Sequence, residues 1–467
     1  MSKKKKAIEE LLEEVVVSEE GQPFEAPNNW AVVKTNTVVD VRDGTHDTPA
    51  YQEEGIPLIT SKNLKNGKLD FTTAKFISEE SHLEIAKRSN VEVNDILFAM
   101  IGTIGNPVLI EQISQEFSIK NVALFKPNIQ KLDSKYFYYY LQSPTYMNHL
   151  KNNEKGSTQK FVPLNVLRNA PLYFPPINEQ KRIAEKVERL LAKIEEAKML
   201  IEEAKETVEL QRAAILDKAF RGELGTNVEN EESIINLLGK DKVLVSTEND
   251  LPKNWVYVKL GNVAKFQGGS QPPKSVFKGE RLDDYIRLVQ IRDFKSDKYK
   301  TYIPKELAKR TFGENDVMIG RYGPPVFQIL RGLSGAYNVA LMKATPIKEL
   351  MDNDFLYYLL QAPFIQNPVI RESHRTAGQT GVRKELIEDF SIGLPPLSEQ
   401  KRIAEKVANL LKKFEVEQEL VETLTDNLAI IKQSILSKAF RGELGTNDPR
   451  EENAIELLKE VLQEQVQ

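Results

Sequence analysis

Apolar residues recur at alternating intervals of four and three positions in two stretches of the chain, each running over about five heptads. Polar Gln211 and Glu417 interrupt the two series. The spacing predicts two long helices, each ~60 Å long for ~40 residues, that pair along a coiled-coil seam. The seam residues are Ile183, Val187, Leu190, Ile194, Ala197, Ile201, Ala204, Val208 and Ile215 in the first helix, and Ile403, Val407, Leu410, Phe414, Val421, Leu424, Leu428, Ile431 and Ile435 in the second.

Both predicted helices have recognisable ends. Each follows a Pro-Pro pair, which ends the preceding segment because proline cannot continue a regular ladder. Asn178 in one and Ser398 in the other are placed to cap the helix start. Gly222 and Gly442 stand where a C-terminal cap glycine belongs.

The segments 30–172 and 255–393 show a different pattern, of short apolar runs separated by turn residues, which is typical of β-strands. Trp30 and Trp255 each open such a run. The Tyr-rich stretches KYFYYYLQSP (135–144) and DFLYYLLQAP (354–363) predict a helix in each segment. We therefore expect an α+β fold in which two similar α/β domains are separated by the two long helices.

The second half of the chain repeats the first. EQKRIAEKV occurs at 179–187 and 399–407, and KAFRGELGTN occurs at 218–227 and 438–447, in both cases 220 positions apart. Looser matches are NVAL at 121–124 and 338–341, and VNDILFAMIG (93–102) with GENDVMIGRYG (313–323). AIEELLEE (7–14), SIINLLGK (233–240) and AIELLKEV (454–461) are versions of one short amphipathic helix. Two units thus carry three copies of that helix, so the repeat is circular, with pseudo-two-fold symmetry.

This symmetry favours an antiparallel, intramolecular helix pair with a globular domain at each end of a rod. The expected parts are an N-terminal helical extension that pairs with the C-terminal region (1–29), a first domain (30–175), a spacer helix (176–222), a linker with a short helix (223–254), a second domain (255–395), a second spacer helix (396–442) and a short C-terminal helix that closes the repeat (443–467). A solvent-facing coiled coil without special meaning and a homodimer zipper remain alternatives.

Composition narrows the class of protein. The 467 residues are 28% charged, and no apolar run reaches the ~18 residues of a membrane span. The lack of cysteine excludes disulfides and thiolate metal sites and fits a cytoplasmic protein. A net charge of -4 argues against nucleic-acid binding, but the average hides a gradient. Residues 255–393 hold 21 Lys and Arg against 15 Asp and Glu.

Signals of catalysis are missing. The four histidines His46, His82, His149 and His374 are scattered, and no phosphate-binding loop is present. The Pro-Pro pairs do not form the Asn-Pro-Pro-Tyr/Phe motif of amino-methyltransferases. We expect no catalytic residue and no metal site, although sequence alone leaves a carboxylate pair in a cleft open.

The two domains differ most in their polar loops, 42–55 against 267–284, 61–68 against 290–298, and 153–161 against 374–384. These loops are rich in side chains that read base edges, a composition that also suits ordinary solvated loops. A resemblance to a known family is carried by the duplicated PP-[IL]-x-EQKRIAEKV and AFRGELGTN motifs, the loops DGTHDTP and GGSQPPKS, and the run YIRLVQIRDF. Essentially the whole chain resembles the specificity (S) subunit of type I restriction–modification systems.

The resemblance implies a non-catalytic subunit whose two target recognition domains each read one half of a bipartite, asymmetric DNA target, with the helices setting the spacer. It implies two methyltransferase subunits as partners, which methylate adenine N6, and restriction subunits recruited through the complex. S-adenosylmethionine, ATP and Mg are then expected only in the partner subunits, with no cofactor in this chain and no membrane partner.

Residues in the divergent loops are the candidates for direct DNA readout, and residues at the identical helix ends are the candidates for docking two copies of one partner. The DNA-reading candidates are Thr45, His46, Lys62, Asn63, Lys65, Gln159, Lys160, Gln271, Lys274, Gln290, Arg292, Arg321, Tyr322, Gln379 and Arg383. The partner-docking candidates are Arg182, Arg221, Glu223, Leu224, Arg402, Arg441, Glu443 and Leu444, although Arg221 and Glu223 could serve only to cap and staple the helix end. Two rival hypotheses are a coiled-coil scaffold with two protein-binding domains and no sequence-selective DNA binding, and a self-sufficient nuclease or methyltransferase.

Overall fold

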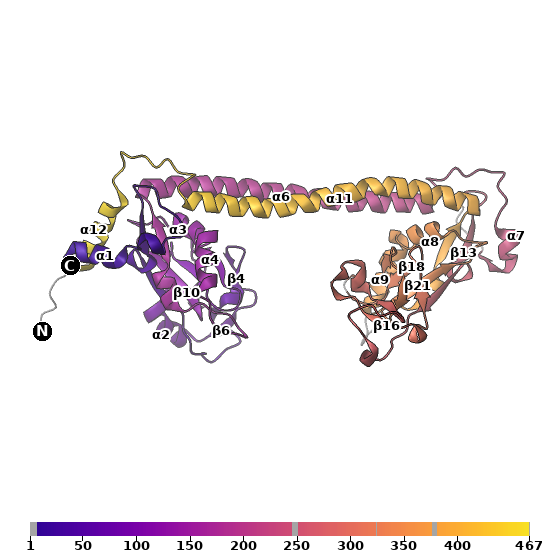
Figure 1. Cartoon of the computed structure of the whole chain (residues 1–467), viewed down its shortest axis with the longest axis horizontal. Coiled ribbons are helices and arrows are strands. Elements are labelled where there is room, and N and C mark those ends of the chain that lie inside the picture. Colours follow the sequence, from indigo (N-terminus) through magenta and orange to yellow (C-terminus); the bar gives the residue numbers. More distant parts are fainter. Residues whose placement is uncertain (1–6, 245–250, 324, 376–380, 467) are drawn as a thin grey trace. The chain divides into compact units, whose positions relative to one another are not determined.

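The computed structural model describes residues 7–244, 251–323, 325–375 and 381–466 (Figure 1). The chain forms two compact units. Unit 1 comprises Met1–Ile201 and Thr423–Gln467, and unit 2 comprises Glu202–Glu422. Unit 2 is thus one continuous segment, whereas unit 1 is assembled from both ends of the chain.

A four-stranded antiparallel sheet lies at the centre of the first domain, in unit 1. Its strands, in order, are β2 (Val39–Asp43), β10 (Val122–Pro127), β7 (Ile96–Ala99) and β8 (Gly105–Leu109). Alternate residues of β7 enter different apolar clusters, Ile96 and Phe98 on one face and Leu97 and Ala99 on the other. Both faces of the sheet are therefore covered, as the period of two in a strand requires.

Smaller elements complete unit 1. The remaining strands are β3 (Ile56–Ile59) between β6 (Lys75–Ile77) and β9 (Ser118–Ile119), β1 (Ala31–Lys34) paired with β11 (Pro171–Phe174), and β4 (Leu64–Lys65) paired with β5 (Lys68–Leu69). The helices are α1 (Ile8–Val15), α2 (Glu79–Ser89), α3 (Ser134–Tyr140), α4 (Pro144–Asn152), α5 (Leu164–Asn169), the start of α6 (Ile177–Phe220), the end of α11 (Leu397–Phe440) and α12 (Ala454–Val466).

Unit 2 repeats this plan. Its central sheet has the order β14 (Ala264–Gly268), β21 (Leu341–Pro346), β18 (Val317–Gly320) and β19 (Gln328–Leu330). The other strands are β16 (Tyr302–Pro304), β15 (Tyr285–Val289), β20 (Gly335–Tyr337) and β17 (Thr311–Phe312) in one sheet, and β12 (Val243–Leu244), β13 (Val256–Lys259) and β22 (Ser391–Leu394) in another. The helices are α7 (Ile235–Leu238), α8 (Asn353–Leu359), α9 (Pro363–Arg375), α10 (Lys384–Glu388), the end of α6 and the start of α11. The predicted α+β class and the helices at both Tyr-rich runs are confirmed.

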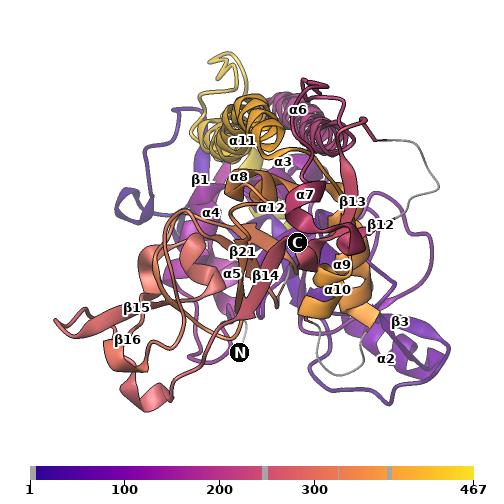
Figure 2. The same cartoon turned by 90° about the vertical axis from the view of Figure 1, so that its right-hand side faces the viewer.

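The two long helices, α6 and α11, each have 44 residues and pack against each other (Figure 2). Each unit contains the start of one helix and the end of the other, so the pairing is antiparallel and intramolecular, as predicted. The helices begin at Ile177 and Leu397. Asn178 and Ser398 therefore lie inside the first turn, and the prediction that they cap the helices is wrong.

The predicted seam is buried mainly near the helix ends. In unit 1, Ile183 and Val187 of α6 and Phe440 of α11 join the core of the first domain. Further along α11, Leu424 and Ile431 remain 41% and 46% exposed. Two helices alone cannot cover every apolar position, so the domains supply most of the burial.

Helix α1 lies against α12 in unit 1 (Figure 1). The backbone N–H of Ala454 donates to the carbonyl of Asn29 at 3.1 Å, and Asn453 donates to the carbonyl of Asn28 at 3.2 Å. In unit 2, α7 and β12 belong to one linker between α6 and β13, whereas α1 and α12 of unit 1 come from opposite ends of the chain. The middle one of the three sequence copies of the short helix, at 233–240, contains α7, which spans only Ile235–Leu238.

Candidate nucleic-acid interface

The central sheets of the two domains match strand for strand. In the smaller sheets, Ile59 pairs with Ile119, and Val289 pairs with Tyr337, in both cases in parallel. These registers match residues 60–63 of the first domain with residues 290–293 of the second. Loop positions in the two domains can therefore be compared one by one.

The register of the central sheets corrects one sequence match. Val122 pairs with Ala99 at the end of β7, and Leu341 pairs with Gly320 at the end of the equivalent strand β18. Val122 therefore corresponds to Leu341 and not to Val339. The two NVAL tetrapeptides are out of structural register, because the second domain has a longer turn before this strand.

In unit 1, the loops at one end of the sheets surround a hollow of about 710 Å³. Of the candidate readers, Lys62, Asn63 and Gln159 line this hollow. The bridge between Thr45 and Lys120 brings the loop after β2 to its rim. The structure thus gathers most of the candidates of the first domain in one place. The full lining is Tyr51, Leu58, Thr60, Ser61, Lys62, Asn63, Thr73, Lys75, Ile101, Gly102, Thr103, Lys120, Asn121 and Gln159.

His46 is held beside this hollow. Its Nε2 lies 2.8 Å from a carboxylate oxygen of Asp43, and its Nδ1 lies 3.0 Å from Oδ1 of Asn121. The loop itself is fixed by the backbone N–H of Thr45, which donates to the carbonyl of Ile119 at 3.0 Å. His46 nevertheless stays exposed. It is therefore an exposed side chain in a defined orientation.

Asn63 does not present a free amide. It is only 3% exposed, and its Oδ1 accepts hydrogen bonds from the backbone N–H and the hydroxyl of Thr60 at 3.0 and 2.9 Å. Its Nδ2 donates to the carbonyl of Asp70 at 2.9 Å and to the hydroxyl of Thr73 at 3.3 Å. We correct the prediction for Asn63: its polar atoms close the turn that carries Lys62, so they are not available to a base.

Two other candidates of the first domain are partly engaged. Lys65 lies in the β4–β5 hairpin, away from the lining of the hollow, and donates to Asp70 at 2.6 Å. Hydrogen bonds from Lys65 and Thr72 lower the pKa of Asp70 to about 2. Lys160 donates to Glu154 at 2.8 Å and remains exposed.

In the second domain, Gln271, Lys274, Arg292 and Arg383 are exposed, as a reading role requires. Gln290 is partly buried, and its backbone N–H donates to Asp293 at 2.7 Å. These residues lie on the loops after β14, after β15 and before α10.

Arg321 and Tyr322 follow β18. The Arg321 guanidinium donates to the carbonyls of Val382 at 3.1 Å and Val339 at 3.4 Å, so it ties three segments of its own domain together. A Cβ atom on Gly381 would lie 2.4 Å from the ring of Tyr322, so the ring closes against that loop. Gln379 lies outside the described residues.

Four residues that line the hollow were not predicted from sequence, namely Tyr51, Lys75, Lys120 and Asn121. The Lys75 ammonium lies 4.2 Å above the centroid of the Tyr51 ring. Lys120 and Asn121 directly precede β10. The NVAL match, which begins at Asn121, was the sequence signal that could have pointed to them.

The repeated motifs meet crosswise at the ends of the long helices. In unit 1, the Glu179 carboxylate at the start of α6 accepts hydrogen bonds from the backbone N–H of Asn447 at 2.9 Å and from the hydroxyl of Thr446 at 2.8 Å. A Cβ atom on Gly445 would lie 1.8 Å from the same carboxylate. The second copy of KAFRGELGTN therefore closes over the first copy of EQKR.

Unit 2 has the reciprocal junction. Glu399 accepts hydrogen bonds from the backbone N–H of Asn227 at 2.9 Å and from the hydroxyl of Thr226 at 2.7 Å. Both glutamates are fully buried. We call the two sites, formed by residues 179–182 with 442–447 and by residues 399–402 with 222–227, the crossed junctions.

The glutamine of each EQKR motif binds the adjoining domain. Gln180 accepts from the backbone N–H of Asp133 at 2.8 Å and donates to the carbonyls of Lys131 and Pro175 at 3.1 and 2.8 Å. Gln400 makes the equivalent three bonds to Asp352, Leu350 and Pro395. Each side chain therefore fixes its domain on the first turn of a long helix.

The tryptophan that opens each domain joins the same junction. Trp30 Nε1 donates to Asn447 at 3.1 Å, and Trp255 Nε1 donates to Asn227 at 3.2 Å. Gly222 and Gly442 have φ values of 84° and 78°, which confirms the predicted glycine caps.

At the junctions, four of the eight partner-docking candidates make contacts within their own unit. Arg182 pairs with Glu179 and Glu451, and Arg402 pairs with Glu399 and Glu231. Leu224 and Leu444 pack against the cores of their own units. These four residues therefore help to hold their own junctions together, and their role in partner docking stays a prediction. Arg221, Glu223, Arg441 and Glu443 are exposed at the surface of the junctions.

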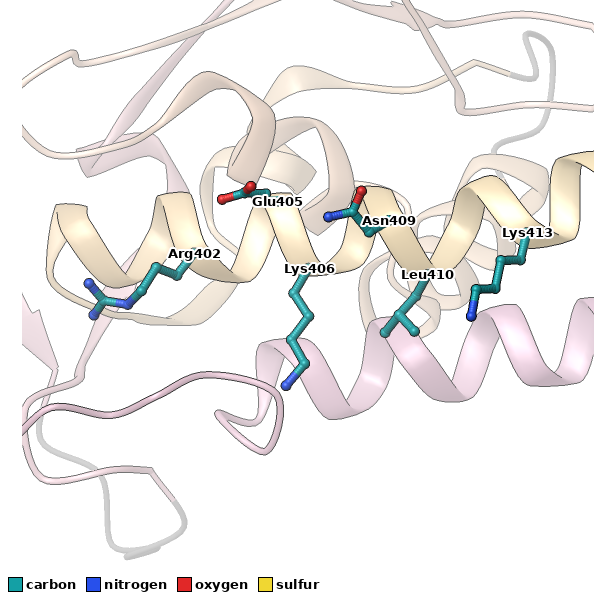
Figure 3. A pocket seen from close by; sticks show the side chains of 6 residues that line it. All are labelled: Arg402, Glu405, Lys406, Asn409, Leu410 and Lys413. Atoms are coloured by element: carbon teal, nitrogen blue, oxygen red, sulfur yellow. The ribbon is translucent and has the colours of Figure 1, made fainter.

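A groove of about 370 Å³ runs along the start of α11 in unit 2 (Figure 3). Leu410 and Lys413 point toward α6 in this view. The lining residues are Arg402, Glu405, Lys406, Asn409, Leu410 and Lys413. The repeat places Arg182, Glu185, Lys186, Arg189, Leu190 and Lys193 at the matched positions of α6.

The described residues contain no group of three or more His, Cys, Asp or Glu that could hold a metal ion. Within the same residues, no helix is long and apolar enough to cross a membrane.

Comparison with known proteins shows what this geometry belongs to. The family described as "Type I restriction modification DNA specificity domain" matches residues 27–206 and 252–426. The chain is 25% identical over 440 residues to the type I restriction enzyme EcoBI specificity subunit of Escherichia coli, covering 89% of this chain and 86% of that one. It is 24% identical over 435 residues to the EcoKI specificity subunit of Escherichia coli strain K12, covering 90% of each.

A solved structure supports the fold. A chain from work described as "Structural basis underlying complex assembly and conformational transition of the type I R-M system" matches with a TM-score of 0.68 and 20% identity, over 90% of this chain and 100% of that one. The family match spans more than half of the sequence and falls on both recognition domains and their helices. The chain therefore belongs to the type I restriction–modification DNA specificity family, whose members are non-catalytic specificity subunits.

Proposed function

We propose that the two target recognition domains read the two different halves of a bipartite, asymmetric DNA target. The observation that carries the proposal is the difference between matched positions on one scaffold. The loop after β2 presents His46 where the loop after β14 presents Gln271 at the matched position. A palindromic target would need identical readers.

The helices α6 and α11 set the spacer between the halves. A helix of 44 residues is about 66 Å long at ~1.5 Å per residue. One turn of duplex is ~34 Å, so the length of the helices corresponds to at most about two turns of DNA, which sets an upper limit for the untouched centre of the target. The reading candidates are exposed or partly buried loop residues, namely Thr45, His46, Lys62, Lys65, Gln159, Lys160, Gln271, Lys274, Gln290, Arg292, Tyr322 and Arg383, with Lys75, Lys120 and Asn121 added.

The matched ends of α6 and α11 dock two copies of one methyltransferase subunit. Arg221 and Glu223 in one unit and Arg441 and Glu443 in the other are exposed and identical, and the groove on α11 has a near-identical counterpart sequence on α6. Restriction subunits join through that complex. S-adenosylmethionine, ATP and Mg belong to the partners. With its modest charge, the subunit alone binds DNA weakly.

The test is reconstitution with an adenine methyltransferase partner, followed by sequencing of N6-methyladenine in a random DNA library. The expected result is one motif with two specified halves and an unspecified centre. A scaffold with two protein-binding domains would give no sequence-selective methylation, and activity from the chain alone would indicate a self-sufficient enzyme.

A further inference from the structure

The first and second domains contain the same small feature, a turn that is closed by a buried side chain and carries an exposed cation. We define the reading turns as residues 60–63 in unit 1 and residues 290–293 in unit 2. Each follows the strand that pairs in parallel with a short strand of the same sheet, β3 with β9 and β15 with β20. The registers place the two turns at the same position of the fold.

Both turns are closed by the same contact. Asn63 accepts from the backbone N–H of Thr60 at 3.0 Å, and Asp293 accepts from the backbone N–H of Gln290 at 2.7 Å. Each has a capping box, and Asn63 and Asp293 are both 3% exposed. The closing residue is therefore an internal brace in each domain, and the backbone of the turn is preorganised before any ligand arrives.

The residue before the brace is a cation in both turns, Lys62 and Arg292, and both are exposed. Among the residues that the structure describes, neither side chain is recorded in a hydrogen bond or an ion pair. Arg292 instead lies over the ring of Tyr299, 5.5 Å from its centroid. Lys62 lines the hollow of unit 1.

We infer that Lys62 and Arg292 are equivalent specificity determinants, each donating to the O6 and N7 acceptors of one guanine in its own half of the target. The inference rests on the proposed function and adds to it the chemical class of base and the residue in each half. Cationic side chains favour that edge because guanine alone presents two adjacent acceptors in the major groove. The planar guanidinium of Arg292 can donate to both acceptors at once in one fixed geometry, whereas the ammonium of Lys62 is a single compact group on a flexible stem. Arg292 is therefore the stricter reader.

The test uses the full chain with its methyltransferase partner and sequences methylated sites from a random bipartite library. Lys62→Gln is expected to relax one guanine position in one half, and Arg292→Gln one position in the other half. The loss of discrimination is roughly 5- to 150-fold at that position. Arg292→Lys gives partial relaxation, and Lys62→Arg keeps or sharpens the preference. Lys68→Gln is the matched control, because Lys68 is an exposed lysine of β5 that lies outside the lining of the hollow and is not a reading candidate.

Three outcomes separate the inferences. An unchanged motif with both Gln variants, while methylation persists, would overturn the guanine assignment and leave the proposed function standing. A second outcome is a uniform loss of binding across all sequences, in which the slope of log affinity against log salt concentration falls by about one. This would assign the cations to phosphates and would also overturn the guanine assignment. Failure of the unmodified complex to methylate any defined motif would instead sink the proposed function itself.

Discussion

Glu179 and Asn447 are 268 positions apart in the chain and are joined by a 2.9 Å hydrogen bond from the Asn447 backbone N–H to the Glu179 carboxylate. The bond links the first turn of α6 to the loop after α11. The matched bond joins Asn227 to Glu399 at 2.9 Å in unit 2. Each unit is thus closed by one copy of EQKR and one copy of KAFRGELGTN, and this explains why both motifs occur twice.

Neutralising either glutamate should loosen its own unit. Glu179→Gln and Glu399→Gln keep the size of the side chain but replace an accepting oxygen with an amide NH₂ that faces other donors. We expect each to lower the free energy of unfolding by about 1–3 kcal/mol, measured by thermal or urea unfolding. Glu185→Gln on the exposed face of α6 is the control, and equal effects of Glu179→Gln and Glu185→Gln would contradict the junction.

The same carboxylates should make stability depend on acid pH. Burial would raise the pKa of Glu179, but hydrogen bonds from Asn447, Arg182 and Thr446 outweigh it, so the pKa lies below its ordinary value of 4.5. The pKa of Glu399 is lowered in the same way. Because the folded state has the lower pKa, the stabilisation is present above pH 4.5 and is lost as the pH falls through the folded pKa.

The measurement is the unfolding midpoint of the unaltered chain and of the Glu179→Gln, Glu399→Gln double variant as a function of pH. Their difference should be constant at neutral pH and shrink below pH 4.5. A difference that persists at lower pH would show that the carboxylate charge does not hold the junctions.

Removing Gln180 should release the first domain from its helix. Gln180→Ala leaves the backbone N–H of Asp133 and the carbonyls of Lys131 and Pro175 without their partner. The expected cost is about 2–4 kcal/mol, with faster hydrogen exchange in residues 131–137. Lys181→Ala, at the exposed neighbouring position, should leave both quantities unchanged, and Gln400→Ala should give the same result in unit 2.

The glycine of each closing loop should tolerate no side chain. An added Cβ would lie 1.8 Å from Glu179 at Gly445 and 2.0 Å from Glu399 at Gly225. We expect Gly445→Ala and Gly225→Ala each to cost about 1–3 kcal/mol in unfolding free energy. Gly279→Ala is the control, since nothing lies within 4 Å of its added Cβ. Wild-type stability in Gly445→Ala would mean that the loop does not close over Glu179.

Exposed arginines at the junctions should matter for assembly and not for folding. Arg221 keeps a side-chain exposure of 66% beside Asp217, and Arg441 lies 5.6 Å from the Phe24 ring. The Arg221→Ala, Arg441→Ala double variant should weaken methyltransferase binding by about 10-fold or more without lowering the unfolding midpoint. Titration calorimetry or gel filtration checks this, with Lys205→Ala as control. Unchanged binding would place the partner elsewhere.

Sequence predicted the architecture well because periodicity and duplication are long-range signals that single substitutions do not erase. The helices, their glycine caps and the circular repeat all followed from spacing. The partner of Glu179 could not be predicted, because nothing local says that a buried carboxylate will meet a backbone N–H from the far end of the chain. The identity of Glu179 and Gln180 in both copies was the available signal.

The orientation of the side chains in the polar loops could not be predicted from sequence, for a related reason. Sequence can identify a polar loop, but it cannot separate side chains that shape the loop from those that face outward. Asn63 and Lys62 are adjacent and equally polar, yet one is a buried brace and the other is exposed. Arg321 was similarly placed among the readers, whereas its guanidinium binds carbonyls of its own domain.

The assembly of unit 1 from both ends of the chain has a consequence for its biosynthesis. Residues 202–422 of unit 2 leave the ribosome together, but unit 1 still lacks Leu436, Phe440 and the loop that covers Glu179 until residues 423–467 emerge. Domains are usually completed in the order of their synthesis. Here the domain translated first is the last to be finished, and its unsealed apolar surface has to be kept from aggregating while the other half of the protein is made.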